Sequence, residues 1–126
     1  MTEIHFAITN AILTGIVILF QFCLSIGLPW GAASMGGKYP GVYPKKMRVV
    51  AVVNMILLIV LLMIVLVNAG LIIQRFMTFS EIAIWFVVGF YGLGTALNTI
   101  TPSKIERIWA PVAAIQLFTT FMVAIK

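Results

Sequence analysis

The sequence is poor in the residues from which most catalytic and metal sites are built. Among its 126 residues there are one cysteine, one histidine and three acidic residues, all of them glutamate. A lone cysteine excludes a disulfide or a thiolate metal site within one chain. Without aspartate, a Ser-His-Asp relay, a paired-aspartate site and magnesium-dependent phosphoryl transfer have little support. We therefore expect no catalytic residue, no metal site, no cofactor and no enzymatic activity.

Charge is scarce as well. Charged residues make up 9% of the chain, whereas soluble domains average about 25%. Hydrophobic residues make up 63%, and the mean hydropathy is +1.18. A chain of this composition cannot cover a folded core with a water-exposed surface, which excludes a soluble monomer and a disordered chain. The composition predicts an integral membrane protein.

Four stretches have the length of about 20 mostly apolar residues that a membrane helix needs: residues 6–28, 49–73, 82–100 and 108–125. They predict an all-α fold, an integral membrane four-helix bundle that forms a single domain over residues 1–126 in the cell membrane. No basic residue precedes the first stretch, and its apolar run exceeds that of a signal peptide. We therefore expect the first stretch to be a membrane span rather than a cleaved leader.

Basic residues predict the orientation of the bundle. Two loops carry six of them, against two elsewhere: Lys38, Lys45, Lys46 and Arg48 lie between the first two spans, Lys104 and Arg107 between the last two, and Arg75 and Lys126 on the other side. Loops rich in lysine and arginine stay in the cytoplasm. Both basic loops are thus predicted to be cytoplasmic and both chain ends outside.

Polar side chains recur within the apolar spans. With about 100° of rotation per residue, Asn10, Thr14 and Gln21 share one face of the first span. An unpaired amide costs several kcal/mol in hydrocarbon, so such faces are predicted to point into the bundle. Hydrogen bonding between helices is one interpretation, and a polar conduit or ligand site is the other. The predicted interior residues are Asn10, Thr14, Gln21, Ser25, Asn54, Asn68, Thr95, Asn98, Gln116 and Thr120.

The two basic loops also carry aromatic residues. Cations beside an anionic membrane surface gain about 1 kcal/mol each, and Trp and Tyr favour the headgroup region. Backbone amides at Gly36-Gly37 offer a further site for an anion; an interfacial anchor is the alternative. The candidate contact residues for a headgroup or a protein partner are Trp30, Lys38, Tyr39, Tyr43, Lys45, Lys46, Arg48, Lys104, Glu106, Arg107 and Trp109.

The loop before the fourth span contains local signals. Ser103 and Glu106 have the spacing of a capping box, in which each side chain bonds the backbone amide of the other. An ion pair between Glu106 and Arg48 is the alternative. Pro111 falls inside the fourth span and predicts a kink. Residues 45–53 and 104–112 share the order basic, basic, apolar, apolar, alanine, which suggests two helical hairpins repeated in parallel.

The two loops together resemble those of a family of small four-helix integral membrane proteins of bacteria. The resemblance rests on Trp30, Gly31, Gly36, Gly37, Pro44, Arg48, Asn98, Ser103, Glu106, Arg107, Trp109 and Pro111. It implies a topology and no chemistry, since no activity is known for that family. In layout the chain is also similar to small multidrug-resistance transporters, but Asn10 and Gln21 stand in the first span where those carry a glutamate.

Three functions remain open at this stage. The first is a binding or accessory component that engages membrane lipid, a larger membrane protein or a second copy of itself through the basic loops. The second is a small oligomeric channel or transporter that passes a neutral or cationic solute along the inward amides. The third is a lipid-headgroup enzyme that uses Glu106 with Arg48 or Arg107. Nucleic acid is not an expected partner, because no loop is long enough to form a docking face. We favour the first.

Overall fold

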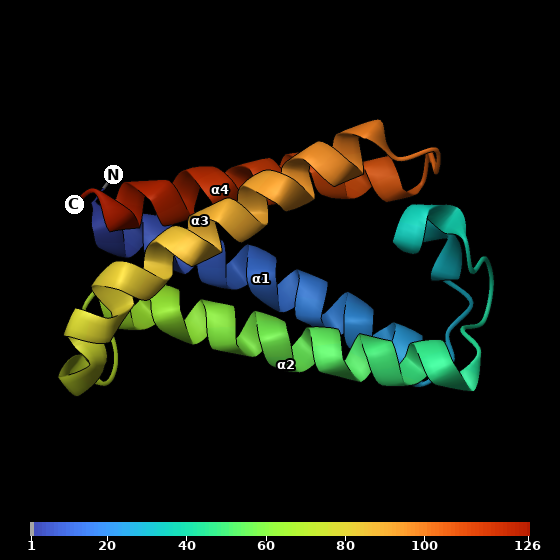
Figure 1. Cartoon of the computed structure of the whole chain (residues 1–126), viewed down its shortest axis with the longest axis horizontal. Helices are drawn as coiled ribbons and strands as arrows, with labels where there is room; N and C mark the ends of the chain where they lie inside the picture. The colour runs from blue at the N-terminus through green and yellow to red at the C-terminus, as the bar shows by residue number, and fades with distance from the viewer. Residues whose placement is uncertain (1) are drawn as a thin grey trace.

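The computed structural model describes residues 2–126, which form an all-helical bundle of four α-helices without a strand (Figure 1). The helices are α1 (Glu3–Ser25), α2 (Lys45–Asn68), α3 (Met77–Ile100) and α4 (Trp109–Ala124). Together with the short turns that precede α3 and α4, all four are long and apolar enough to cross a membrane. The predicted four-helix membrane fold is confirmed.

Two of the helices end earlier than hydropathy predicts, at Ser25 and Asn68 rather than at residues 28 and 73. The cause is a glycine with positive φ just beyond each helix, Gly27 at +101° and Gly70 at +81°. At α2, the amide of Leu71 bonds the carbonyl of Leu66, and that of Gly70 bonds Val67. This is the Schellman pattern, which stops a helix whatever the apolarity of the residues that follow.

Three helices begin earlier than hydropathy predicts, because residues before their apolar runs are helical too; α1 begins at Glu3 rather than at residue 6. α2 begins at Lys45, directly after Pro44, and α3 begins at Met77 rather than at residue 82. Pro111 lies in the first turn of α4, where backbone amides have no acceptor within the helix. Pro111 therefore removes no hydrogen bond within α4, and the predicted kink loses the physical reason that a position in the helix interior would give it.

Each helix packs against its two neighbours in a ring, α1 on α2 and α4, and α3 on α2 and α4. The main core cluster includes Ala7, Leu61, Val65, Val87 and Val123. Many large apolar side chains nevertheless stay on the outside of the bundle, as a membrane helix requires. The hydrophobic surface of this fold thus faces outward all along the spans.

The two ends of the bundle differ. One end, called here the termini end, holds both chain ends and the α2–α3 turn; the other, called the loop end, holds residues 26–44 and 101–108 (Figure 1). Both basic loops therefore lie at the same end. From their shared turn, α2 and α3 diverge toward the loop end. The proposed repeat has unequal copies: Lys45 and Arg48 stand in the first turn of α2, whereas Lys104 and Arg107 precede α4.

Candidate functional site

The first loop folds into a compact cap over the loop end. It contains two 3₁₀ turns, Gly31–Ala33 and Met35–Gly37. The amide of Gly31 donates to the carbonyl of Gly41 at 2.9 Å and closes the loop on itself. A Cβ atom at Gly31 would lie 1.9 Å from the carbonyl oxygen of Tyr39, so the crossing requires glycine. The cap is defined as residues 31–43.

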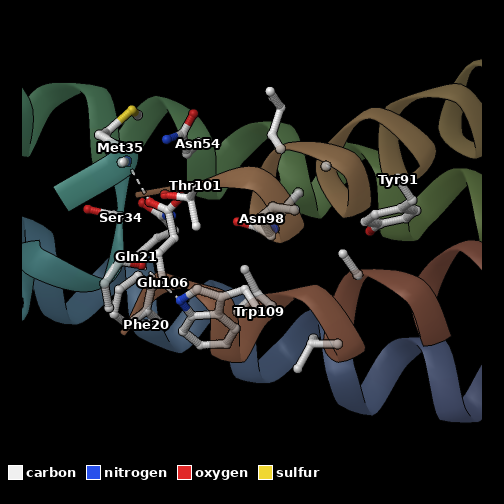
Figure 2. Close-up of a pocket in the computed structure, with 18 of the residues that line it drawn as sticks. Phe20, Gln21, Ser34, Met35, Asn54, Tyr91, Asn98, Thr101, Glu106 and Trp109 are labelled. Atoms are coloured by element: carbon white, nitrogen blue, oxygen red, sulfur yellow. Dashed lines mark hydrogen bonds between the residues drawn. The ribbon is translucent and has the colours of Figure 1, made fainter. Parts of the chain in front are cut away.

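A buried carboxylate ties this cap to the second loop. Glu106 is 7% exposed, and its Oε2 accepts a hydrogen bond from the backbone amide of Gly36 at 2.7 Å (Figure 2). Gly36 and Gly37 both have positive φ, at +66° and +76°, a conformation that presents backbone amides to an anion. An external anion at this glycine pair was one of the two interpretations of the sequence, beside an interfacial anchor. The amide of Gly36 instead bonds a side chain of the same chain.

Two more side chains join the loops. The hydroxyl of Ser103 donates to the carbonyl of Ala32 at 2.6 Å, and the indole of Trp109 donates to the carbonyl of Ala33 at 3.0 Å. Ser103 Oγ also accepts from the amide of Glu106 at 3.2 Å. Half of the predicted capping box is thus confirmed. Its other half is wrong, because the glutamate side chain reaches across to the cap rather than back to the amide of Ser103.

Tyr43 anchors the far side of the cap. Its buried hydroxyl bonds the side chain of Ser34, and its carbonyl accepts from Nε of Arg48 at 3.1 Å. Burial raises the pKa of the Tyr43 phenol, the bond to Ser34 opposes this, and the nearby Glu106 carboxylate raises it further. Arg48 and Glu106 have different partners, and no ion pair joins them within residues 2–126.

A cavity of about 820 Å³ lies below the cap, between the diverging α2 and α3. Its walls come from all four helices and are mostly apolar. Four carboxamides border it. Gln116 of α4 is buried and bonds Thr14. The other three, Gln21 of α1, Asn54 of α2 and Asn98 of α3, are partly exposed, and their side chains form no hydrogen bond with residues 2–126 (Figure 2). The size is within the range of about 300–1,000 Å³ that is typical of small-molecule sites.

A buried polar network closes the bundle beyond the cavity. Nδ2 of Asn10 lies 3.0 Å from the hydroxyl of Thr119 and 2.9 Å from that of Thr120. Nε2 of Gln116 donates to Thr14 at 3.0 Å. Every buried side-chain nitrogen and oxygen in the described residues has a partner. This network therefore joins α1 to α4 without leaving a polar group free for a ligand.

The predicted interior residues divide into two groups. Asn10, Thr14, Asn68, Gln116 and Thr120 are buried, whereas Gln21, Ser25, Asn54, Thr95 and Asn98 are partly exposed. At the termini end, Asn68 bonds Ser80 and the amine of Lys126. Ser25 and Thr95 bond carbonyls of their own helices. Of the predicted set, only the side chains of Gln21, Asn54 and Asn98 are left without a partner among the described residues.

The predicted contact residues all lie at the loop end, but not all on its surface. Two of them, Tyr43 and Glu106, are buried, and three are half-buried, namely Tyr39, Arg48 and Trp109. The exposed ones are Trp30, Lys38, Lys45, Lys46, Lys104 and Arg107. The buried pair, Tyr43 and Glu106, bonds groups within the cap and is not exposed to a headgroup.

Two members of the buried network, Tyr91 and Thr119, are missing from the predicted set. Tyr91 lies 3.4 Å from the hydroxyl of Thr14 and also lines the cavity. Its position four residues before Thr95 and seven before Asn98 places it on the same face of α3. That spacing is the signal by which it could have been found.

No protein-family model matches the chain, and searches of curated proteins and of solved structures found no match. What the site can do chemically therefore follows from its own residues. Its carboxylate is bonded to the cap, five of its six cations are exposed, and its cavity offers neutral amides.

Proposed function

We propose that this chain is a small membrane protein with a binding role, which engages anionic lipid headgroups through the surface of its loop end. The distribution of charge carries this proposal. The exposed cations of that end are Lys38, Lys45, Lys46, Lys104 and Arg107. Its one acidic residue, Glu106, is buried. The other two glutamates lie toward the termini end, Glu3 in the first turn of α1 and Glu81 near the start of α3. No exposed carboxylate offsets the cations.

The cap brings the cations of both loops onto one surface. Lys38 follows the Met35–Gly37 turn, and its amide bonds the carbonyl of Met35 at 3.2 Å. Lys104 is adjacent to Ser103, which bonds the cap at Ala32. Because these bonds already order the two loops, a headgroup meets a preformed cluster. Each cation near an anionic membrane surface contributes about 1 kcal/mol.

The buried network supports binding over transport. A conduit through one chain needs a continuous polar path from the loop end to the termini end. Between these two ends, the side chains of Asn10, Thr14 and Gln116 form hydrogen bonds with one another and with α4, so they offer no polar path to a solute. An enzymatic role for Glu106 has less support, because the carboxylate is buried and bonded to Gly36.

The proposal is tested in nanodiscs of phosphatidylcholine that contain a minor fraction of phosphatidylglycerol. Lipids retained by the protein on extraction are counted by native mass spectrometry. We expect phosphatidylglycerol to be enriched on the natural chain. The combined change Lys45→Gln, Lys46→Gln, Lys104→Gln and Arg107→Gln should remove the enrichment, because it removes about 1 kcal/mol for each charge.

Arg75→Gln is the matched control, because Arg75 is an exposed cation in the α2–α3 turn at the termini end. It should leave the enrichment unchanged. Equal enrichment on the quadruple variant and the natural chain would refute a role for these cations. A protein that is retained in place of lipid, and lost with the same four changes, would show that the surface serves a protein partner instead.

A further inference from the structure

The cavity below the cap opens sideways, toward the surroundings of the helices. Leu57 of α2 and Leu97 of α3 both line it, and they are 39% and 52% exposed. Phe90 of α3 lines it as well and is also exposed. These rim residues belong to the apolar parts of two spans. The mouth between α2 and α3 therefore faces the hydrocarbon of a membrane, with apolar side chains at its rim.

Three of the four carboxamides that line the cavity have no partner. Gln21, Asn54 and Asn98 come from three different helices and border one space, and their side chains form no hydrogen bond within residues 2–126. An amide left unpaired at membrane depth is unfavourable, and acyl chains offer it no hydrogen bond. Each amide both donates and accepts. A head with hydroxyl and carbonyl groups satisfies all three.

The charges of the lining favour an uncharged head. One carboxylate, Glu106, and one amine, Lys38, border the cavity on the side of the cap. A carboxylate head would meet Lys38 but also Glu106, and an ammonium head would meet Glu106 but also Lys38, so neither sign gains a net attraction. A charged head would in addition lose its hydration in a mostly apolar cavity, which costs far more than the burial of a neutral polar head. The neutral amides distinguish neither sign.

We infer that the cavity binds one molecule of a neutral single-chain amphiphile, of the monoacylglycerol type. Its hydroxyl- and carbonyl-bearing head lies among Gln21, Asn54 and Asn98, and its hydrocarbon tail leaves between α2 and α3. The volume of about 820 Å³ suits a ligand with one chain. This site differs from the basic surface, since its head-binding groups are neutral amides and its ligand carries no charge; of the five surface cations, only Lys38 also borders the cavity.

Trp109 provides the probe for this inference. It lines the cavity, with its ring 4.7 Å from that of Phe20. The other two tryptophans, Trp30 and Trp85, are exposed and lie outside the cavity. In a Trp30→Phe, Trp85→Phe background, Trp109 is the only tryptophan of the chain, and excitation at the red edge of the absorption band selects it over tyrosine. In phosphatidylcholine nanodiscs, a monoacylglycerol with a dibrominated chain should quench it with a saturable dependence on mole fraction. Dibrominated phosphatidylcholine at the same bromine content should quench less.

Gly94 allows the cavity to be filled without disturbing the fold. It lines the cavity, and a Cβ atom there would meet nothing within 4 Å. Gly94→Leu should raise the mole fraction for half-maximal quenching about tenfold, the effect of excluding about two methylene groups of the ligand. Gly89→Leu is the matched control, because Gly89 lies on the same helix in equally open space outside the cavity. It should leave the quenching curve unchanged.

A separate variant tests how the cavity binds the polar head of the lipid. Asn98→Leu removes one hydrogen bond to that head and should weaken lipid binding about fivefold. Thr99→Val is its control, since Thr99 is exposed on the same helix and bonds only the carbonyl of Thr95. A dibrominated fatty acid at alkaline pH and a dibrominated alkyl amine should both quench less than the neutral lipid.

Three results would overturn the inference. The first is quenching by the neutral lipid that is linear in mole fraction and equal to that by the brominated phospholipid. The second is an identical response of the Gly94→Leu and Gly89→Leu proteins. The third is stronger quenching by the charged amphiphiles, which would refute the uncharged head. Since no anionic phospholipid is present, these outcomes do not depend on the phosphatidylglycerol test.

Discussion

The replacement of Glu106 by alanine tests what holds the cap in place. The carboxylate is buried and accepts the amide of Gly36 at 2.7 Å across 70 positions of sequence. A hydrogen bond to a charged group contributes about 1.5–3 kcal/mol. Alanine removes this bond and leaves the amide of Gly36 without an acceptor. We expect the free energy that opposes local opening of the cap to fall by that amount.

Hydrogen exchange measures this loss of free energy as a faster exchange rate of backbone amides in the cap. Amides that exchange through local opening speed up in proportion to the population of the open form. At about 1.4 kcal/mol for each factor of ten, the expected acceleration is about 10-fold to 150-fold. Gly31 and Gly37 report on it, because their amides bond the carbonyls of Gly41 and Ser34 inside the cap. Amides in the middle of α1 and α2 should keep their rates.

The measurement is hydrogen exchange with mass spectrometry on peptides from residues 26–44, in detergent micelles. Glu106→Gln keeps an uncharged acceptor and should cause a smaller acceleration than Glu106→Ala. Glu81→Ala, at an exposed acid near the start of α3, is the control and should change nothing in the cap. If the cap peptides exchange at the natural rate in the Glu106→Ala protein, the carboxylate does not hold the cap.

Two further changes test the network and the loop crossing. Asn10→Leu removes the two amide hydrogens donated to α4. It should lower the free energy of unfolding in mixed micelles by about 1–3 kcal/mol, at about 0.6–1.7 kcal/mol per hydrogen bond between membrane helices. Ser25→Ala, at a purely local bond, should have little effect; an Asn10→Leu protein as stable as the natural chain would contradict this account. Gly31→Ala should lower the thermal midpoint, since its Cβ meets the carbonyl of Tyr39 and overpacking costs about 1–3 kcal/mol. Gly15→Ala, in open space on α1, should not lower it, and a drop of equal size would show that the effect is not the clash.

Local patterns predicted what local interactions decide. The bond from the amide of Glu106 to Ser103 spans three residues and follows from their spacing. The side chain of Glu106 had two alternatives in the sequence, the amide of Ser103 and Arg48, and it bonds neither. Its actual partner, Gly36, became accessible only because the first loop turns back over the bundle. The glycine pair and the glutamate were both recognised as important, but not as partners.

The polar face of α1 also shows which features local patterns decide and which depend on distant contacts. Spacing along α1 placed Asn10, Thr14 and Gln21 on one face, and the structure turns that face into the bundle. The spacing could not predict that Asn10 and Thr14 lie where α4 packs closely against α1, while Gln21 lies where α2 and α3 have separated. The divergence of two helices depends on packing along their whole length. Whether a given amide is hydrogen-bonded or borders the cavity therefore depends on residues far from it in sequence.

By itself, the sequence determined four apolar helices, the gathering of basic residues in two loops and the positions of the amides along each helix. These depend on composition and on contacts within a few turns, so they can be read along the chain. Only the tertiary structure decided which amides bond one another, which border a cavity, and which glycine amide meets Glu106. Those outcomes depend on contacts between residues 70 to 110 positions apart, and such contacts leave no periodic pattern in one sequence.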